Sequence, residues 1–264
     1  MNRLLITGAA GGLGRILRDK LAGYAPLLRL SDIAELGAAG PGEEVVPCDL
    51  ADAAAVDRLV EGCDGIVHLG GMSVENAFET ILQSNIRGSY NVFEAARRLG
   101  RPRILFASSN HAIGFHRRED RLDGNSKQRP DSLYGLSKCF GENLGSYYFD
   151  KFGLESVAVR IGSCFPEPKD RRMLATWLSP DDFVRLVKAV FEATRVGHTM
   201  VYGASANREQ WWDNGHAAFL GWVPQDSSEQ FRAKVEAASP RQDPEDPAVR
   251  FQGGGFAAAG HFED

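Results

Sequence analysis

The sequence predicts an α/β fold, a doubly wound parallel sheet followed by a small C-terminal substrate-binding layer. Short apolar runs alternate with longer helical patterns through the first half of the chain, as in βαβ units. A glycine-rich turn directly follows the first apolar run, and after Gly162 the alternation gives way to a loop rich in proline and charge. We therefore expect a main domain over residues 1–162 and a smaller region over residues 163–264, or one compact domain that contains both.

Strands are expected where a short apolar run is closed by Gly, Asp, Ser or Pro, because strands of a parallel sheet are buried on both faces. Six runs meet this description: Leu4–Thr7, Leu27–Ser31, Glu44–Pro47, Gly65–Leu69, Arg103–Ser108 and Ser156–Ile161. Helical patterns fill the intervals, over Gly12–Gly23, Ala53–Gly62, Ala77–Leu99 and Leu133–Phe152.

The C-terminal region has weaker patterns. A helix is expected to begin near Ser179, which suits an N-cap and is followed by Pro180, a residue favoured in the first turn. The segment Ser239–Pro247 is rich in Pro and Asp and is expected to be a surface arm. Glycines at positions 253, 254 and 255 indicate irregular structure rather than helix.

The composition is that of an ordinary globular protein. The 264 residues include 30 basic and 35 acidic side chains, a net charge of −5, and no basic stripe, which argues against nucleic-acid or anionic membrane partners. The four cysteines are scattered, so neither a metal site nor a disulfide framework is expected. With no signal-peptide pattern and no apolar run of membrane-spanning length, we expect a soluble, cytoplasmic protein.

The glycine-rich turn predicts a dinucleotide site of the Rossmann type. Glycines at positions 8, 11 and 14 let a pyrophosphate approach the N-terminus of the following helix. Asp32 ends the second strand, where its carboxylate can bind the adenosine ribose hydroxyls and would repel a 2′-phosphate. NAD is therefore favoured over NADP. The alternative is a structural glycine turn with a capping aspartate.

Tyr134 and Lys138 lie one helical turn apart, on the same face of a predicted helix. A phenol with a pKa near about 10 is a weak base, but an adjacent cation and an oxidised nicotinamide stabilise the phenolate. This predicts Tyr134 as the base and Lys138 as the group that lowers its pKa. An exposed amphipathic pair is the alternative, and the preceding strand ending in Ser108-Ser109 argues against it.

Together with Asp49-Leu50, His68-Leu69-Gly70-Gly71 and Asn85, these motifs resemble the extended short-chain dehydrogenase/reductase superfamily over residues 1 to about 165. The resemblance implies Ser109, Tyr134 and Lys138 as catalytic residues. It also implies an NAD site formed by Gly8, Gly11, Gly12, Leu13, Gly14, Asp32, Ile33, Asp49, Leu50, Leu69, Gly70, Gly71, Asn85, Ser108, Tyr134, Lys138 and Ile161. His68 has no partner at metal-ligand spacing and is expected to be a core residue.

The substrate is expected to be small. Most members of this superfamily act on nucleotide-linked sugars and carry a longer C-terminal domain, whereas only about a hundred residues follow the sixth predicted strand here. Lys169, Arg171 and Arg172 add positive charge to the loop after that strand, and an arginine there can hold a carboxylate with two hydrogen bonds. Solvated surface charges are the alternative.

The motifs Gly71-Met72-Ser73, Ser109-Asn110-His111, Ile161-Gly162-Ser163-Cys164 and Arg171-Arg172 resemble the uronate dehydrogenase family across nearly the whole chain. The resemblance implies NAD-dependent oxidation of the C1 hemiacetal hydroxyl of a hexuronic acid, such as D-glucuronate or D-galacturonate, to an aldarolactone. It implies a substrate site formed by Ser73, Ser109, Asn110, His111, Tyr134, Ser163 and Arg172, in which Arg172 holds the C6 carboxylate.

Two other functions use the same motifs, a sugar epimerase or small carbonyl reductase and a non-catalytic NAD-sensing protein. Helices Ala77–Leu99 and Leu133–Phe152 resemble the pair that forms subunit contacts in relatives, so a homo-oligomer is expected. The sequence leaves open the order of that oligomer, the preferred uronate, its anomer, the lactone ring size and the role of residues 239–264.

Overall fold

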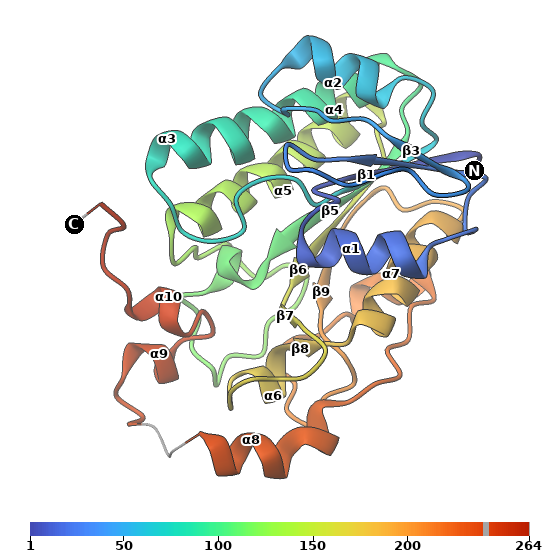
Figure 1. The fold of residues 1–264 in the computed structure, drawn as a ribbon. Coiled ribbons are helices and arrows are strands. Elements are labelled where there is room, and N and C mark those ends of the chain that lie inside the picture. The colour runs from blue at the N-terminus through green and yellow to red at the C-terminus, as the bar shows by residue number, and fades with distance from the viewer. Residues whose placement is uncertain (240–242, 264) are drawn as a thin grey trace.

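The computed structural model describes residues 1–239 and 243–263 (Figure 1). Seven strands form one parallel sheet in the order β3-β2-β1-β4-β5-β6-β9. The chain runs outward from β1 in one direction and from β4 in the other, so a crevice opens at the carboxyl ends of these two strands. The strands are β1 (Arg3–Thr7), β2 (Leu27–Ser31), β3 (Glu43–Val45), β4 (Gly65–His68), β5 (Arg103–Ser109), β6 (Ser156–Ile161) and β9 (His198–Gly203).

Helices cover both faces of the sheet. α1 (Gly12–Lys20) and α7 (Pro180–Glu192) lie on one face, and α2 (Ala53–Val60), α4 (Gly88–Arg98) and α5 (Leu133–Phe152) lie on the other (Figure 1). One apolar cluster packs α1 and α7 against the strands, and a second packs the other three helices. The predicted doubly wound α/β fold is confirmed.

The sheet contains one strand that was not predicted. β9 pairs in parallel with β6 over its whole length, from Ser156 opposite His198 to Ile161 opposite Gly203. It comes from the region expected to form the smaller layer, so residues 1–162 and the region after them share one sheet. The run His198–Gly203 mixes polar and apolar residues, and so it lacks the continuous apolar character used to find the other strands.

The predicted helix Ala77–Leu99 changes pitch along its length. It begins as α3 (Phe78–Ile81), widens into a turn of π-helix over Leu82–Arg87, and continues as α4. The π-turn turns Asn85 toward the interior, where its side chain is buried. Such turns are frequent at functional sites because they aim one side chain differently from the rest of the helix.

A small layer lies beside the carboxyl ends of the strands, built from β7 (Ser163–Cys164), β8 (Trp177–Leu178), α6 (Met173–Thr176), α8 (Arg232–Ala238), α9 (Pro247–Arg250) and α10 (Gly255–Ala258). Short 3-10 helices span Asn110–Ile113, Gly215–Leu220 and Ser228–Phe231. As predicted, Ser179 caps α7: its hydroxyl accepts a hydrogen bond from the Asp182 amide at 2.9 Å.

The predicted C-terminal arm is partly described. Residues 243–247 are exposed, as expected, whereas 240–242 lie outside the described residues. Gly253 and Gly254 are non-helical, but Gly255 begins α10, so the expectation of irregular structure fails at that glycine. Within the described ranges, no helix combines the length and hydropathy that crossing a membrane requires.

Candidate active site

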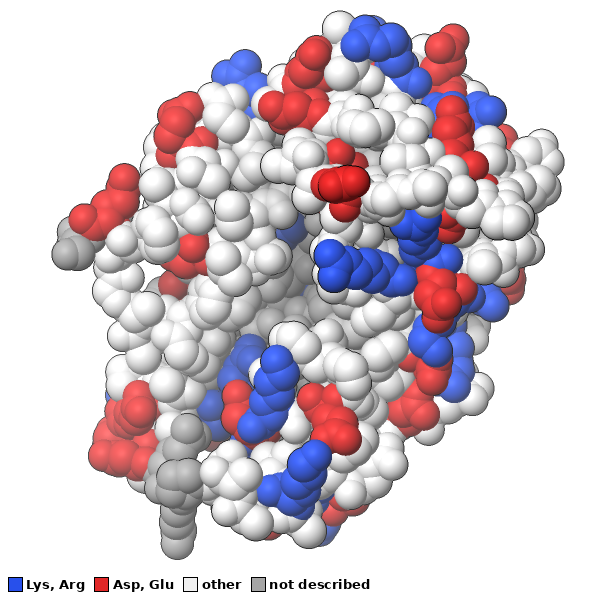
Figure 2. All heavy atoms as spheres, viewed as in Figure 1, with Lys and Arg blue, Asp and Glu red and all other residues white. Residues whose placement is uncertain are grey.

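The crevice between β1 and β4 opens onto a hollow near the middle of the face in Figure 2, close to the start of α1 and between that helix and α10. The side chains and loops around it come from the carboxyl ends of β1, β2, β4, β5 and β6 and from the beginning of α5. Most of the residues predicted to form the site lie there.

The glycine-rich loop leaves room for a ligand at the N-terminus of α1. Gly8 has a φ of +70°, and a Cβ atom there would lie 2.8 Å from the Gly70 amide nitrogen. A Cβ atom at Gly14 would lie 2.3 Å from the Gly8 carbonyl oxygen, whereas one at Gly12 would meet nothing within 4 Å. No side chain caps α1, so the backbone N–H groups of its first turn are free to face an anion such as a pyrophosphate.

Asp32 holds this loop in place. One carboxylate oxygen accepts a hydrogen bond from the Ala10 amide at 2.9 Å, and the other accepts one from the Ala34 amide at 3.0 Å. Each oxygen keeps a further acceptor position for a ribose hydroxyl. Ile33 beside it is 79% exposed, and Leu50 is buried next to Gly70. These residues fit the adenosine part of a dinucleotide.

His68 supports the next loop from within the core. Its Nδ1 atom lies 2.8 Å from Thr7 Oγ1 and its Nε2 atom lies 3.2 Å from Ser89 Oγ, while Thr7 Oγ1 also accepts the Gly70 amide at 3.1 Å. Burial, with a smaller effect of the Lys138 charge, lowers the pKa of His68 to about 3. A neutral, hydrogen-bonded histidine positions Gly70, and among the described residues no His/Cys/Asp/Glu group can hold a metal ion.

Ser109, Tyr134 and Lys138 come together at the ends of β5 and the start of α5. A hydrogen bond joins Ser109 to the Tyr134 phenol, and Lys138 Nζ lies 5.4 Å from the centre of the Tyr134 ring. Tyr134 and Lys138 are 7% and 6% exposed. Burial raises the pKa of Tyr134 to about 12, against the effect of the Ser109 hydrogen bond, and lowers the pKa of Lys138 to about 8.

Lys138 has no acidic partner among the described residues. No hydrogen bond or ion pair joins its Nζ atom to any of the residues that the structure describes. A buried ammonium without a partner is costly, and ribose hydroxyls or a phenolate supply the acceptors it lacks. The chemistry of this donor therefore fits a nicotinamide ribose beside Tyr134.

Two contacts that the sequence did not indicate set the position of Tyr134. The carboxylate of Glu75 accepts hydrogen bonds from the backbone amides of Leu133 at 3.0 Å and Tyr134 at 2.8 Å, and so caps α5. Glu75 lies 59 residues from Tyr134 in the sequence, and no local pattern marks this contact.

Asn85 ties the same loop to α5. Its side chain accepts the Met72 amide at 2.7 Å and donates to the Met72 carbonyl at 3.0 Å and to Ser137 Oγ at 2.9 Å. A Cβ atom at Gly71 would lie 2.8 Å from the Asn85 side-chain oxygen. The exposed Ser73 follows Met72 directly and is thereby held near the crevice. Asn85, predicted to contact NAD, uses its amide within the protein.

Ser108 and Ser109 point to opposite faces of β5. The Ser108 hydroxyl donates to Glu142 at 2.6 Å, and Glu142 forms a buried ion pair with Arg160 at 2.8 Å. The side chain of Ser108 therefore serves an internal network, and only its backbone is available to the predicted NAD site. The sequence did not indicate Glu142 or Arg160.

Of the basic cluster predicted in the loop after β6, only Arg172 turns into the crevice. Arg171 instead donates to the Ser239 carbonyl at 3.1 Å and pairs with Glu236 on α8 at 3.4 Å. Lys169 lies 4.1 Å from the centre of the Phe165 ring. The turn from Asp170 to Arg172 points neighbouring side chains in different directions, so Arg172 and not Arg171 faces the predicted substrate residues.

Arg172 meets the predicted substrate residues. Its Nη1 atom lies 3.5 Å from Ser163 Oγ, and its Nη2 atom lies 2.5 Å from the side-chain amide of Asn110. With that amide oriented so that its oxygen faces Arg172, Asn110 accepts the Nη2 hydrogen, and its nitrogen donates to the Ile161 carbonyl at 3.1 Å. Burial lowers the pKa of Arg172 to about 10, which leaves it cationic at neutral pH. No carboxylate among the described residues forms an ion pair with it.

His111 lies between this arginine and Tyr134. Its Nδ1 atom is 2.9 Å from Asp131 Oδ2, and its ring centre is 5.8 Å from that of Tyr134. The ring of Phe256, from α10, stacks on His111 with centres 3.9 Å apart. Asp131 and Phe256 were not predicted, although Asp131-Ser132 directly before a helix resembles an N-terminal signal.

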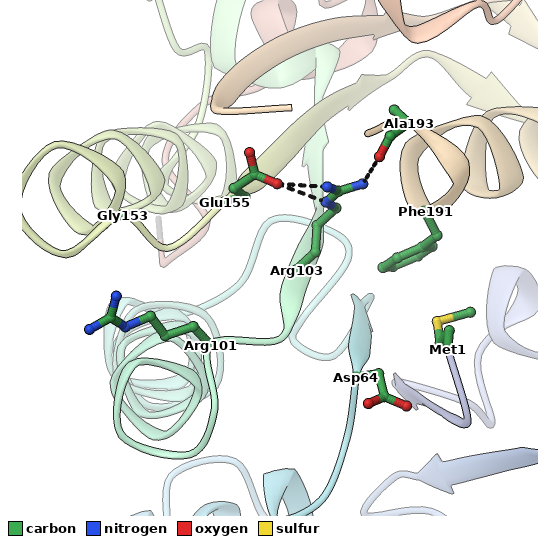
Figure 3. Close-up of a pocket in the computed structure, with 8 residues that line it drawn as sticks. All are labelled: Met1, Asp64, Arg101, Arg103, Gly153, Glu155, Phe191 and Ala193. Atoms are coloured by element: carbon green, nitrogen blue, oxygen red, sulfur yellow. Dashed lines mark hydrogen bonds and ion pairs between the residues drawn. The ribbon is translucent and has the colours of Figure 1, made fainter. Parts of the chain in front are cut away.

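A second hollow lies at the opposite, amino-terminal edge of the sheet (Figure 3). Arg103 there pairs with Glu155 at 2.6 Å and donates to the Ala193 carbonyl at 2.6 Å, while Arg101 points away from it. Asp64 accepts backbone amides at the N-terminus of the chain. These partners are structural, and none of the predicted site residues lines this hollow.

Comparisons with known proteins agree with the geometry. A model of the NAD dependent epimerase/dehydratase family matches residues 4–180. Uronate dehydrogenase from Pseudomonas putida is 60% identical, over 99% of this chain and 97% of that protein. The crystal structure of glucuronic acid dehydrogenase from Chromohalobacter salexigens is 62% identical, with a TM-score of 0.98 over 100% of this chain and 99% of that one.

A mutant of uronate dehydrogenase from Agrobacterium tumefaciens, solved in complex with NAD, is 59% identical, with a TM-score of 0.96 over 98% of both chains. The similarity thus extends through the small C-terminal layer as well as the sheet.

Proposed function

The chain belongs to the NAD dependent epimerase/dehydratase family and, within it, to the uronate dehydrogenases, and we propose that it oxidises C1 of a hexuronic acid with NAD as the electron acceptor. One observation carries this proposal for the site itself. Arg172, a buried arginine that forms no ion pair with a carboxylate of the described residues, lies in the same crevice as the Ser109, Tyr134 and Lys138 group. Asn110 and His111 join it to that group.

Recognition of an acid follows from the unpaired charge of Arg172. A buried guanidinium is stable only when anions or several acceptors compensate its charge. Among the described residues the hydrogen-bond partners of Arg172 are neutral, and the carboxylates of Asp170 and Asp131 act on its charge without forming an ion pair with it. A carboxylate accepts two parallel hydrogen bonds from one guanidinium. The C6 carboxylate of D-glucuronate or D-galacturonate supplies that partner.

The hydroxyls of the sugar require polar groups that are already oriented. Ser73, Asn110, His111 and Ser163 surround the space between Arg172 and Tyr134 in this proposal. Ser163 Oγ is held at 3.0 Å from Thr176 Oγ1, and His111 is held by Asp131. Preorganised partners of this kind lower the entropy lost on binding.

NAD binding is assigned to the other end of the crevice. The free amides at the start of α1 donate hydrogen bonds to the pyrophosphate, for which the glycine loop leaves room, and Asp32 accepts hydrogen bonds from the adenosine ribose hydroxyls. The proposed contacts are Gly8, Gly11, Gly12, Leu13, Gly14, Asp32, Ile33, Asp49, Leu50, Leu69, Gly70, Gly71, Asn85, Ser108, Tyr134, Lys138 and Ile161, of which Asn85 and Ser108 contribute only support or backbone.

In the reaction, Ser109 donates a hydrogen bond to the C1 oxygen and Tyr134 removes the proton from the C1 hydroxyl. The Lys138 ammonium, whose Nζ atom lies 5.4 Å from the centre of the Tyr134 ring, stabilises the phenolate when it forms. The hydrogen bond from Ser109 opposes the effect of burial on the pKa of Tyr134. NAD, when bound, accepts the hydride. Because C1 of the cyclic hexuronic acid is a hemiacetal carbon, loss of a proton and a hydride leaves an aldarolactone.

We also propose that the protein is a cytoplasmic homo-oligomer. Large apolar side chains on α3, α4 and α5 are about half exposed, and they support a homo-oligomer that packs this face against a second copy. They are Phe78 (50%), Tyr90 (48%), Leu136 (51%) and Tyr147 (48%). All four cysteines are free thiols, in keeping with a reducing cytoplasm. Sedimentation of the purified protein tests the oligomer.

The activity is tested by mixing the protein with NAD and either D-glucuronate or D-galacturonate and following the absorbance of NADH. We expect NADH to accumulate with uronates and far more slowly with D-glucose or D-galactose, which lack the carboxylate. An epimerase regenerates its cofactor and gives no net NADH, and an NAD-sensing protein gives none with any sugar. Either of those results contradicts the proposal.

A further inference from the structure

The segment Arg250–Phe256, named here the C-terminal strap, is fixed along the substrate end of the crevice. Its backbone pairs with the loop after β5: the Gln252 amide donates to the His116 carbonyl at 2.9 Å, and the Gly253 amide donates to the Gly114 carbonyl at 2.9 Å. Figure 1 shows the two short helices on either side of the strap, α9 and α10, lying along one side of the small layer. The strap thus reaches the residues assigned to the substrate.

Gln252 anchors the strap and touches Arg172. Its side chain is fully buried, donates to the Arg117 and Asp120 carbonyls at 3.0 Å each, and accepts the Trp212 indole N–H at 2.8 Å. The Gln252 carbonyl oxygen is therefore held in place, and it accepts the Arg172 Nε hydrogen at 2.7 Å. This bond uses the Nε–H donor and leaves an N–H on each Nη group for a carboxylate bound with two hydrogen bonds.

The glycines of the strap allow this close approach. A Cβ atom at Gly253 would lie 1.8 Å from Asp131 Oδ2, and one at Gly254, whose φ is +65°, would lie 2.7 Å from Arg172 Cδ. At Gly255 a Cβ atom would meet nothing within 4 Å. Two of the three adjacent glycines are therefore required by contacts with residues of the site, and the third is not.

Phe256 completes the contact. Its ring stacks on His111 at 3.9 Å with an angle of 26° between the planes, and its centre lies 6.2 Å from that of Tyr134. With Asp131 on Nδ1 and Phe256 on one ring face, the imidazole has one orientation, in which Nε2 is directed away from Asp131. The apolar ring also removes water from the neighbourhood of the phenol.

We propose that the C-terminal strap is a built wall of the uronate site, in which Gln252 is a positioning residue for Arg172 and Phe256 determines specificity by holding His111 and excluding water. This inference rests on the proposed function, because the ligand it serves is the uronate. It predicts that damage to the strap weakens uronate binding and leaves NAD binding unchanged, since the hydrogen bonds and ring contacts described for the strap go to the substrate end of the crevice and not to the glycine loop.

The first test compares two alanine substitutions at adjacent glycines. Gly254→Ala introduces a Cβ atom against Arg172, whereas Gly255→Ala introduces one into open space and is the matched control. We expect Gly254→Ala to raise the KM for D-glucuronate by about tenfold or more with a smaller change in kcat, because ground-state and transition-state contacts of the carboxylate are lost together. The Kd for NAD should not change, and Gly255→Ala should match the wild type.

The second test concerns Phe256. Phe256→Ala should lower kcat/KM for D-glucuronate by about tenfold, and Phe256→Tyr, which keeps the stacking ring, should restore most of it. The ratio of kcat/KM for D-glucuronate to that for D-glucose should fall in Phe256→Ala. If Phe256 served folding alone, its replacement would lower kcat/KM equally for both substrates. The loss would then follow the fall in melting temperature and not the presence of the aromatic ring.

The outcomes separate the strap from the activity. If the wild type oxidises uronates and Gly254→Ala keeps the wild-type KM, the inference is wrong. If the wild type reduces no NAD with any uronate, the proposed function fails. Amide hydrogen exchange at Gln252 and Gly253 then tests the strap. Slow exchange in the wild type and in Gly255→Ala, together with fast exchange in Gly254→Ala, supports docking of the strap onto Arg172. Fast exchange in the wild type contradicts that docking.

Discussion

The two ends of the crevice are built in different ways. At the cofactor end, one continuous turn, Gly8–Gly14, faces the pyrophosphate with its backbone, and Asp32, which follows the second strand, faces the adenosine ribose. At the substrate end, Arg172 meets the side chain of Asn110, which follows β5, and the backbone carbonyl of Gln252 in the C-terminal strap. A phosphate needs only amides and space, whereas a sugar acid needs several groups in a fixed arrangement.

The difference has a consequence for experiments. Changes at the cofactor end should appear in the Kd for NAD, and changes at the substrate end should appear in the KM for the uronate. Changes where the two ends meet should appear in kcat alone.

Tyr134→Phe removes the proposed base at the junction of the two ends. We expect kcat to fall by about a thousandfold or more, because proton removal from the C1 hydroxyl loses its acceptor. NAD titration by fluorescence should give a Kd within about twofold of the wild type, since the cofactor contacts are otherwise intact. Activity equal to the wild type would remove Tyr134 from the role of base.

Arg172→Ala tests the substrate end. The expected result is a loss of about a hundredfold or more in kcat/KM for D-glucuronate, because a charge-assisted pair of hydrogen bonds is deleted from a buried position. The slow reaction with D-glucose should change little. Equal losses for the acid and the neutral sugar would show that Arg172 acts on the fold of the site and not on the carboxylate.

Asp32→Ala tests the cofactor end. Loss of the carboxylate removes both the hydrogen bonds to the Ala10 and Ala34 amides and the proposed ribose contact. We expect the Kd for NAD to rise by about tenfold and the preference for NAD over NADP to shrink, because the repulsion of the 2′-phosphate disappears. A rise in the KM for the uronate, measured at saturating NAD, would contradict the expectation that changes at the cofactor end affect only NAD binding.

Lys138→Met concerns stability. Burial lowers the pKa of Lys138 from 10.5 to about 8. Between these values the unfolded chain holds a proton that the folded site has released, so this group makes the ligand-free protein more stable as the pH rises from about 8 to 10.5. At neutral pH the buried charge destabilises the fold. Lys138→Met should therefore raise the free energy of unfolding of the ligand-free protein by about 1–3 kcal/mol at neutral pH.

Thermal unfolding without NAD at several pH values checks this expectation. The difference in melting temperature between Lys138→Met and the wild type should shrink as the pH approaches 10, while activity stays low throughout. A variant less stable than the wild type at neutral pH would show that Lys138 contributes more through packing on Phe106, 5.2 Å from its Nζ atom, than it costs as a charge.

The same division explains what could be predicted from the sequence. The bounds of β2, β6 and α5 were predicted to the residue, because apolar runs and helical patterns are local and end at local signals. The glycine turn and Asp32 belong to one βαβ unit, so their spacing was informative. Arg172 was the only member of its cluster to enter the crevice, and periodicity in an irregular loop cannot distinguish it from Arg171.

The contacts that were missed join distant parts of the chain. Arg172 and Gln252 are 80 residues apart, and Glu75 and Tyr134 are 59 apart. A buried glutamine or a capping glutamate carries no spacing rule, because its partner is chosen by the tertiary fold. β9 was missed for a related reason: it becomes a strand by pairing with the edge of β6, and its own sequence is only weakly strand-like.

The π-turn over Leu82–Arg87 lets one long helix serve two purposes. An α-helix repeats every 3.6 residues, so a wider turn shifts the phase of everything after it by part of a revolution. Without that shift, α4 could not pack its apolar face on the sheet while Asn85 reaches Met72. Removing one residue from this stretch would restore a regular α-helical repeat and would rotate the Asn85 side chain away from Met72. The helix would remain continuous, but the loop that carries Met72 would lose the contact that fixes it.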